Sequence, residues 1–348
     1  MRRAARRGLL LGAGLAAAAA GAVLSRRRRA LDFRDRVVLI TGGSRGLGLE
    51  LARRFASQGA KLALLARKGT ELERATAHLA SANGGSQDHT EVELLECDLR
   101  DREQVERSVA RTVRRFGRLD VLVNNAGTIR VGPFDNLSLK EFRQEMDINF
   151  FGALHATTAA LPHLKRSGRG RIVNITSIGG RLPVPHLLPY AASKFAFVGF
   201  SEALGAELAR DGVRVTTVTP GLMRTGSPYR AMFSGRRGRE FRWFLLASSL
   251  PLVSIGSELA ARRIVDACRH GDASLVVPAY LRLPIALHAL APGTVSRLAG
   301  VVNRLLPEPA TDQFPGRLRE GREILPPEQS PAYATLTRRA ALRNNELE

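Results

Sequence analysis

The chain has 348 residues, of which 44% are hydrophobic and only 5% aromatic, and its formal net charge is +21. That length and apolar content suffice for one large hydrophobic core, which excludes a largely disordered chain. Clustered cations can bind phosphate backbones, but no stretch here interleaves its arginines with the stacking aromatic residues of single-strand binders. We therefore expect no nucleic-acid partner.

Cysteine and histidine spacing gives no sign of a metal site. Cys97 and Cys268 stand far apart in apolar patterns, which is typical of a protein from a reducing compartment rather than of a disulfide framework. The seven histidines lack the HExxH or paired spacing of metal ligands, so we expect no bound metal.

The first apolar segment, residues 8–24, carries no charge and is bounded on both sides by arginines. As a helix it would span about 25 Å, slightly less than the hydrocarbon core of a bilayer, about 30 Å. Three interpretations remain open: a membrane anchor, a cleaved export signal of twin-arginine type beginning at Arg6 and Arg7, and a soluble amphiphilic tail. The arginines at 26–29 favour an anchor, and we treat residues 1–30 as an anchor-like or signal-like segment.

From residue 36 onward, short apolar and β-branched runs alternate with longer segments of helical periodicity. The expected strands are Val37–Ile40, Leu62–Ala66, Val92–Cys97, Leu119–Asn124, Arg171–Thr176, Val213–Thr219 and Leu275–Val277. The clearest helices are Arg102–Phe116, Leu139–Lys165 and Leu188–Arg210. Strands that are apolar throughout and joined by helices form parallel sheets covered on both faces. We therefore predict an α/β fold, a doubly wound parallel sheet of the Rossmann type, over residues 31–280.

Beyond Pro278 the composition changes. Residues 281–306 are rich in leucine, alanine and valine, and we expect amphipathic helices there. These helices could lie on a membrane, close over the site described below, or pack against the domain surface. The last thirty or so residues are proline-rich and charged, so residues 281–348 are expected to form an extension that is partly helical and then loosely ordered.

A glycine-rich turn joins the first strand to the next helix. The backbone of such a turn can approach a pyrophosphate, whose charge then faces the amino end of the helix. The candidate dinucleotide-binding residues are Thr41, Gly42, Ser44, Arg45, Gly46, Leu47 and Gly48.

The end of the second strand indicates which dinucleotide is bound. A dinucleotide without a 2′-phosphate is usually held there by an acidic residue, whereas this chain has Arg67 and Lys68. With no carboxylate to repel the phosphate and Arg45 as a third cation nearby, we expect NADP(H), with NAD(H) as the alternative. Asp98, followed by Leu99, is placed to contact the adenine, although a strand-ending Asp is also a common helix cap.

Tyr190 and Lys194 are four residues apart and therefore share one face of a helix. The ammonium group can stabilise the phenolate form, so we expect Tyr190 to have a lowered pKa and to exchange a proton near neutral pH. Ser177 precedes Tyr190 by thirteen residues, at the end of the fifth expected strand.

Together these motifs make the chain resemble the short-chain dehydrogenase/reductase family. The resemblance runs from about Arg36 to Pro278. It rests on the glycine turn, Asn124-Asn125-Ala126-Gly127, Asn149, Ser177, Tyr190-Ala191-Ala192-Ser193-Lys194 and Pro220-Gly221. It implies hydride transfer between a nicotinamide and a carbonyl or alcohol carbon, and a homodimer or homotetramer.

The resemblance also implies a role for each residue. Tyr190 would transfer the hydroxyl proton, and Ser177 would hydrogen-bond the substrate oxygen. Lys194 would lower the tyrosine pKa and hold the nicotinamide ribose, and Asn149 would hold a water in a proton relay. Further cofactor contacts would come from Asn125, Ala126, Gly127, Pro220, Gly221 and Thr225.

The loops after the fifth and sixth strands, residues 178–189 and 222–250, should determine the substrate. Their apolar residues include Met223, Tyr229, Phe233, Phe241, Trp243 and Phe244. We expect a lipophilic substrate, such as a steroid, retinoid-like or long-chain acyl compound.

Two alternatives remain. One is a soluble 3-oxoacyl-thioester reductase, with the arginines of 236–242 binding an acidic carrier protein. The other is a nucleotide sensor without catalysis, which the intact Ser177, Tyr190 and Lys194 argue against.

Residues 8–24 lead us to expect a membrane-associated protein. Because NADPH is a cytoplasmic reductant, we expect its catalytic domain to face the cytoplasm, with twin-arginine export as the alternative.

Overall fold

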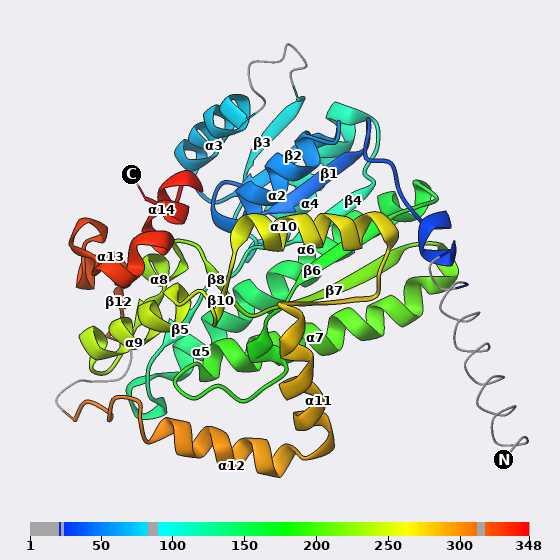
Figure 1. The fold of residues 1–348 in the computed structure, drawn as a ribbon. Helices are drawn as coiled ribbons and strands as arrows, with labels where there is room; N and C mark the ends of the chain where they lie inside the picture. The colour runs from blue at the N-terminus through cyan, green and yellow to red at the C-terminus, as the bar shows by residue number, and fades with distance from the viewer. Residues whose placement is uncertain (1–20, 22–23, 83–89, 312–316, 348) are drawn as a thin grey trace, which may run out of the picture.

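The computed structural model describes residues 21, 24–82, 90–311 and 317–347. Its central element is a seven-stranded parallel sheet with the strand order β11-β7-β6-β4-β1-β2-β3 (Figure 1). The strands are β1 Val37–Thr41, β2 Lys61–Ala66, β3 Val92–Glu96, β4 Val121–Asn124, β6 Arg171–Ile175, β7 Arg214–Pro220 and β11 Ser274–Val277. All seven expected strands are present, and the predicted doubly wound α/β fold is confirmed.

Helices connect these strands, and smaller elements surround them. The helices that pack on the sheet are α2 Gly46–Ala56, α3 Gly69–Ala82, α4 Arg102–Phe116, α6 Gly152–Arg166, α7 Leu188–Leu208 and α10 Ser257–His270. Helix α5 Leu139–Met146 packs against α7. The remaining helices are α8 Ser227–Arg230, α9 Arg237–Ser249, α11 Arg282–Leu290, α12 Pro292–Asn303, α13 Gly321–Ile324 and α14 Thr335–Arg343. The remaining strands are β5 Arg130–Val131, β8 Leu222–Arg224, β9 Met232–Phe233, β10 Ser254–Gly256 and β12 Arg319–Glu320.

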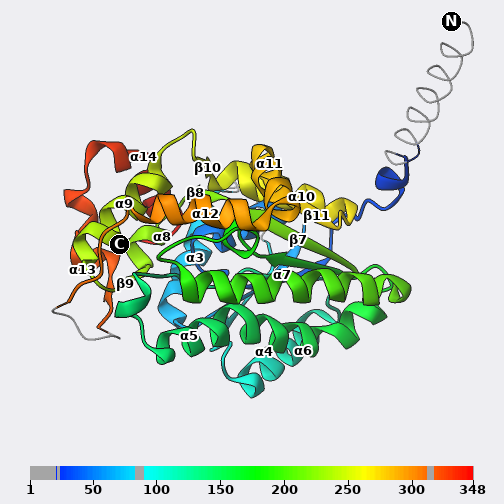
Figure 2. The same ribbon diagram turned by 90° about the horizontal axis from the view of Figure 1, so that it is seen from below.

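Strand β1 supplies side chains to both faces of the sheet, because successive residues of a strand point in opposite directions. Val38 and Ile40 pack with residues of α2 and α10, whereas Val37 and Leu39 pack with residues of α4 and α6. Figure 2 shows α4, α6 and α7 on one side of the sheet and α10 on the other. These four apolar side chains are fully buried, and each stabilises the fold by about 1.5–3 kcal/mol.

The helix expected over 139–165 contains an irregular turn. Between α5 and α6, residues Asp147–Phe151 form one π-helical turn, which carries the predicted site residue Asn149. Single π turns inside α-helices insert an extra residue and redirect side chains, often at functional sites. Hydrophobic periodicity predicted the helix but not this turn.

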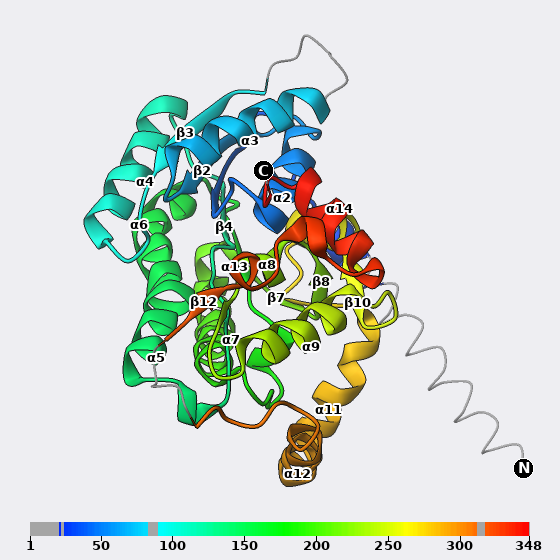
Figure 3. The same cartoon turned by 90° about the vertical axis from the view of Figure 1, so that its left-hand side faces the viewer.

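The carboxyl-terminal region corrects part of the sequence prediction. Helices α11 and α12 form as expected, but neither has a buried residue. Residues 319–347 are not loosely ordered: β12 pairs with β9, and α14 buries Thr337 and Ala341 beside α9. The proline-rich, charged composition predicted loose order. However, small side chains pack between α9 and α14, where the Ser249 and Thr337 hydroxyl oxygens lie 2.9 Å apart. Figure 3 shows this red segment beside α2.

The expected membrane segment, residues 8–24, lies outside the described residues except for Gly21 and Leu24. In the described part of the chain, no helix is by itself long and apolar enough to cross a bilayer. Ala279–Leu290 and Pro292–Asn303 meet that length and composition criterion only as a pair, with a bend of 116° between them.

Candidate active site

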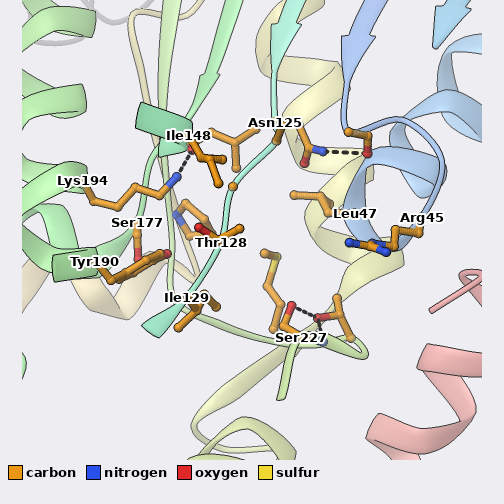
Figure 4. Close-up of a pocket in the computed structure, with 18 of the residues that line it drawn as sticks. Arg45, Leu47, Asn125, Thr128, Ile129, Ile148, Ser177, Tyr190, Lys194 and Ser227 are labelled. Atoms are coloured by element: carbon orange, nitrogen blue, oxygen red, sulfur yellow. Dashed lines mark hydrogen bonds between the residues drawn. The ribbon is translucent and has the colours of Figure 1, made fainter. Parts of the chain in front are cut away.

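A cavity of about 440 Å³ opens at the carboxyl edge of the central strands. In Figure 4, Arg45 and Leu47 stand on one side of it and Ser177, Tyr190 and Lys194 on the other. Of the predicted site residues, its lining includes Gly42, Ser44, Arg45, Gly46, Leu47, Arg67, Lys68, Asp98, Leu99, Asn125, Ala126, Gly127, Ser177, Tyr190, Lys194, Pro220, Gly221 and Thr225. The other three, Thr41, Gly48 and Asn149, do not line the cavity and instead contact residues that do.

Thr41 and Asn125 fix the glycine turn to the end of β4. The Thr41 hydroxyl oxygen accepts hydrogen bonds from the backbone N–H groups of Asn125 (3.0 Å) and Ala126 (3.1 Å). The Asn125 side-chain amide donates to the carbonyl oxygens of Thr41 and Gly42 at 3.0 and 3.2 Å. Gly48 closes the turn, since a Cβ there would lie only 2.1 Å from the Gly42 carbonyl oxygen. These contacts fix the backbone of the turn at the edge of the cavity, and its role in binding a pyrophosphate stays a prediction.

Asn149 ties the segment after β4 to α7. Its Oδ1 accepts from the Thr128 N–H at 2.8 Å, and its Nδ2 donates to the Thr128 carbonyl oxygen at 3.1 Å and to Ser193 Oγ at 3.0 Å. Gly127 lies between Asn149 and Lys194: a Cβ on Gly127 would be 2.9 Å from Asn149 Oδ1 and 3.6 Å from Lys194 Nζ. These contacts hold the segment after β4 against α7, and the water-holding role of Asn149 stays a prediction.

The Tyr190 pKa differs from the sequence prediction. Desolvation raises the pKa of Tyr190 to about 12, and the facing Ser177 hydroxyl offsets this only partly. Lys194 Nζ donates to the Ile175 carbonyl oxygen at 3.0 Å and lies 5.7 Å from the centre of the tyrosine ring. Burial lowers the pKa of Lys194 to about 8. The predicted lowering of the Tyr190 pKa is therefore wrong in this structure, because burial outweighs the distant ammonium. Tyr190 keeps its proton at neutral pH and is a potential acid.

A buried ion pair contacts Thr128 and Asn149. Arg130 Nη1 bonds Glu145 Oε2, and both side chains are almost completely buried. Thr128 Oγ1 donates to Glu145 Oε2 at 3.1 Å, and Asn149 Nδ2 donates to Oε1 at 3.1 Å. Burial raises the pKa of Glu145, which Arg130 opposes. Neither residue belongs to a sequence motif, and only the fold brings them together.

The opposite end of the cavity contains a carboxylate that the sequence prediction excluded. Glu71, in the first turn of α3, lines the cavity and accepts two hydrogen bonds from Arg45 Nη1 at 2.8 and 2.9 Å. Lys68 Nζ lies 3.9 Å and Arg230 Nη1 4.0 Å from the same carboxylate. Asp98 pairs with Arg100 at 2.5 Å, and this contact lowers the pKa of Asp98. The lining at this end thus has three cations, Arg45, Arg67 and Lys68, and three carboxylates, Glu71, Asp98 and Glu346, and Arg45 is paired with Glu71.

The predicted substrate loops divide into lining and core. Met223, Trp243 and Phe244 line the cavity together with Ile129, Val184 and Leu187. In contrast, Tyr229, Phe233 and Phe241 are fully buried and do not line the cavity, so their predicted lining role is wrong. They pack in one apolar cluster with the lining residues Leu187 and Phe244. The wall near Tyr190 is apolar nevertheless.

Glu346, near the carboxyl end, is a further lining residue that no sequence signal indicated. Its Oε2 accepts a hydrogen bond of 2.5 Å from the Gly226 N–H. A carboxyl group thus reaches the cavity wall from the region that composition suggested was loosely ordered.

The sequence motifs and this cavity agree with a match to a family model described as short chain dehydrogenase, over residues 36–230. The chain belongs to the short-chain dehydrogenase/reductase family. The enzymes of this family are oxidoreductases that use NAD(P)(H), and the resemblance in the sequence is confirmed at this level.

Two curated proteins illustrate the relationship. This short-chain dehydrogenase/reductase is 36% identical over 259 residues to "11-beta-hydroxysteroid dehydrogenase A" of Sesamum indicum, covering 72% of this chain and 71% of that protein. It is 35% identical over 210 residues to "Dehydrogenase/reductase SDR family protein 7-like" of Anopheles gambiae, covering 60% of this chain and 66%, just under two thirds, of that protein.

A solved structure shares the fold. The short chain dehydrogenase of Mycobacterium paratuberculosis, bound to NAD, superimposes with a TM-score of 0.61 at 26% identity, covering 71% of this chain and 97% of that one.

Proposed function

We propose that this protein is an NADP(H)-dependent oxidoreductase that transfers a hydride between the nicotinamide and the carbonyl or alcohol carbon of a lipophilic substrate. One observation carries the proposal: Ser177, Tyr190 and Lys194 meet at the apolar end of a cavity whose other end contains the glycine turn and several cations. The proposal is supported because groups suited to proton transfer, to dinucleotide binding and to an apolar substrate line one cavity.

The chain's own residues would move the proton. A bound nicotinamide dinucleotide supplies the hydride, which forms the new C–H bond. Tyr190, which is protonated at neutral pH, gives its proton to the carbonyl oxygen, and Ser177 donates a hydrogen bond to the same oxygen. The resulting phenolate is stabilised by the Lys194 ammonium, which lies 5.7 Å from the ring centre. Oxidation of the alcohol runs these steps in reverse.

The preference for NADP(H) rests on Arg45, Arg67 and Lys68, which line the cavity, while Glu71 is already paired with Arg45. A 2′-phosphate adds negative charge that these cations can pair with. We expect kcat/KM for NADPH to exceed that for NADH by at least about tenfold. The double variant Arg67→Ala, Lys68→Ala should lose most of that preference and leave turnover with NADH unchanged. Equal use of both dinucleotides by the wild type would support NAD(H), the dinucleotide of the solved neighbour.

The lipophilic substrate is supported by the wall of Ile129, Val184, Leu187, Met223 and Trp243. The test is NADPH oxidation with matched sets of carbonyls: small polar ketones, steroid or long-chain ketones, and 3-oxoacyl thioesters with and without a carrier protein. The lipophilic set should show the highest kcat/KM. A preference for carrier-bound thioesters would support the reductase alternative, with the arginines of 236–242 as the docking surface.

Self-association and membrane binding remain proposals. Phe151, Leu188 and Phe195 are 42%, 39% and 41% exposed on and near α6 and α7, which favours a homodimer or homotetramer through these helices. Light scattering of the wild type and of Phe195→Ser would test this.

Leu283 and Leu290 on α11, 76% and 86% exposed, add apolar surface to the predicted anchor. Flotation with anionic vesicles, with and without residues 1–30, would test membrane association, and protease accessibility in spheroplasts would test a cytoplasm-facing domain.

A further inference from the structure

Residues 344–347, which we call the strap, lie against the glycine turn. The carbonyl oxygen of Asn344 accepts a hydrogen bond of 2.8 Å from the N–H of Gly46, the first residue of α2. Asn345 Nδ2 donates to the carbonyl oxygens of Ser44 at 2.9 Å and Glu71 at 3.0 Å. Arg45, at the cap position of α2, makes no side-chain cap hydrogen bond. The strap therefore caps the helix whose amino end a pyrophosphate would face.

The strap also places a carboxyl group in the cavity. Glu346 is only 5% exposed, yet it lines the cavity. Its Oε2 accepts from the Gly226 N–H, and its Oε1 lies 3.0 Å from where a Cβ on Gly46 would be. Its backbone carbonyl accepts from Arg230 Nε at 3.1 Å. The carboxyl group thus lies between the glycine turn and the segment after β8, beside the turn at which we expect the pyrophosphate.

Several charged groups face this carboxyl group. Arg45 and Arg230 attract its ionised form, but both also contact Glu71, as does Lys68. Desolvation is the largest influence and raises the pKa of Glu346 to about 7, against the Gly226 N–H and the two arginines. When protonated, the group can donate a hydrogen bond to a phosphate oxygen. When ionised, it repels the phosphate at close range.

We propose that Glu346 is a cofactor-facing residue whose carboxyl group meets the pyrophosphate of the bound dinucleotide and sets the affinity for it through its charge. This inference rests on the proposed function, since it requires a dinucleotide in this cavity. On this proposal the strap is part of the dinucleotide-binding site. Glu346 then determines affinity from outside residues 36–230, the segment that the family model matches.

The test is direct binding of NADH, followed by its fluorescence, to the wild type, Glu346→Gln and the matched control Glu323→Gln, whose side chain is exposed on α13. NADH is the probe because it lacks the 2′-phosphate, which titrates near pH 6. Between pH 6 and 8 the wild type and the control should lose about tenfold in affinity through ionisation of Glu346, and Glu346→Gln should not. Lys194 titrates in the same window, but its effect is common to all three proteins.

The outcomes separate this inference from the proposed function. If the three proteins bind NADH with the same pH dependence, the inference alone is overturned. If none binds NADH or NADPH at any pH, the proposed function fails and the inference with it. Glu346→Asp retains a titrating carboxyl group, so it should keep a pH dependence that Glu346→Gln loses. If Glu346→Gln and Glu346→Asp weaken NADH binding equally at every pH, the strap only supports the fold. That result would also overturn the inference.

Discussion

The central sheet with its loops and the region after β11 hold their functional groups in different ways. In the first, Thr41, Asn125 and Asn149 are bonded to backbone groups at the ends of adjacent parallel strands, so the sheet itself creates the site. In the second, short elements and exposed helices end in a strap that joins the site through individual contacts to Ser44, Gly46 and Gly226. The residues proposed for the chemistry are thus held by the sheet, whereas Glu346, proposed to set the affinity for the dinucleotide, is held by an extension to it.

The largest effect should follow from Tyr190→Phe, which removes the proton donor and leaves the ring. General acid catalysis contributes about 10²–10⁴, so kcat should fall roughly 10³-fold while the dissociation constant for NADPH stays within about twofold. Tyr280→Phe is the control in the second region, because its side chain is 53% exposed and outside the cavity lining. Less than a tenfold loss in Tyr190→Phe would show that another group supplies the proton.

Arg130→Met should cost the most stability, because it leaves the Glu145 carboxylate buried without its partner. Breaking a buried pair destabilises proteins by about 3–5 kcal/mol. The matched exposed pair is Arg102 and Glu106 on α4, where Arg102→Met should change the unfolding free energy by less than about 1 kcal/mol. Denaturant unfolding measures both, and equal costs would mean that Glu145 is neutral in the folded protein.

Glu346→Gln should alter the pH dependence of stability. The folded pKa of Glu346, about 7, lies above its ordinary value of 4.5. The stability linked to this group is therefore fully present below pH 4.5 and is lost as the pH rises through 7. Relative to the variant, the wild type should lose at most about 3 kcal/mol of unfolding free energy between pH 5 and 8. Parallel Tm profiles of the two proteins would contradict this.

The smallest effect is expected in the exposed helices of the second region. Leu290 and Leu298 are 86% and 55% exposed, so serine at either position should change the unfolding free energy by less than about 0.5 kcal/mol. The contrasting site is Leu39, fully buried in the sheet, where alanine should cost about 2–5 kcal/mol. A cost above about 1 kcal/mol at Leu290 would show that α11 is covered in solution.

Much of the first region follows from the sequence, because apolar strands and four-residue spacing record local geometry. The glycine turn and the facing Ser177, Tyr190 and Lys194 are local signals of this kind. The Tyr190 pKa was mispredicted because spacing shows that a lysine is near but not how well the phenol is shielded from water. Glu71 was missed because Arg45, a residue 26 positions earlier, directs it into the cavity. The Arg130–Glu145 pair and Glu346 depend on contacts between segments that carry no shared pattern.

The hydrogen bond between Asn345 and Ser44 joins segments 301 positions apart in the chain. The central sheet can be complete once β11 has been synthesised, whereas the contacts of the strap with the glycine turn cannot form until residues 344–347 have been synthesised. A nascent chain stalled between these two points would already contain Tyr190 on α7, and we expect it to bind the proposed dinucleotide differently from the released protein.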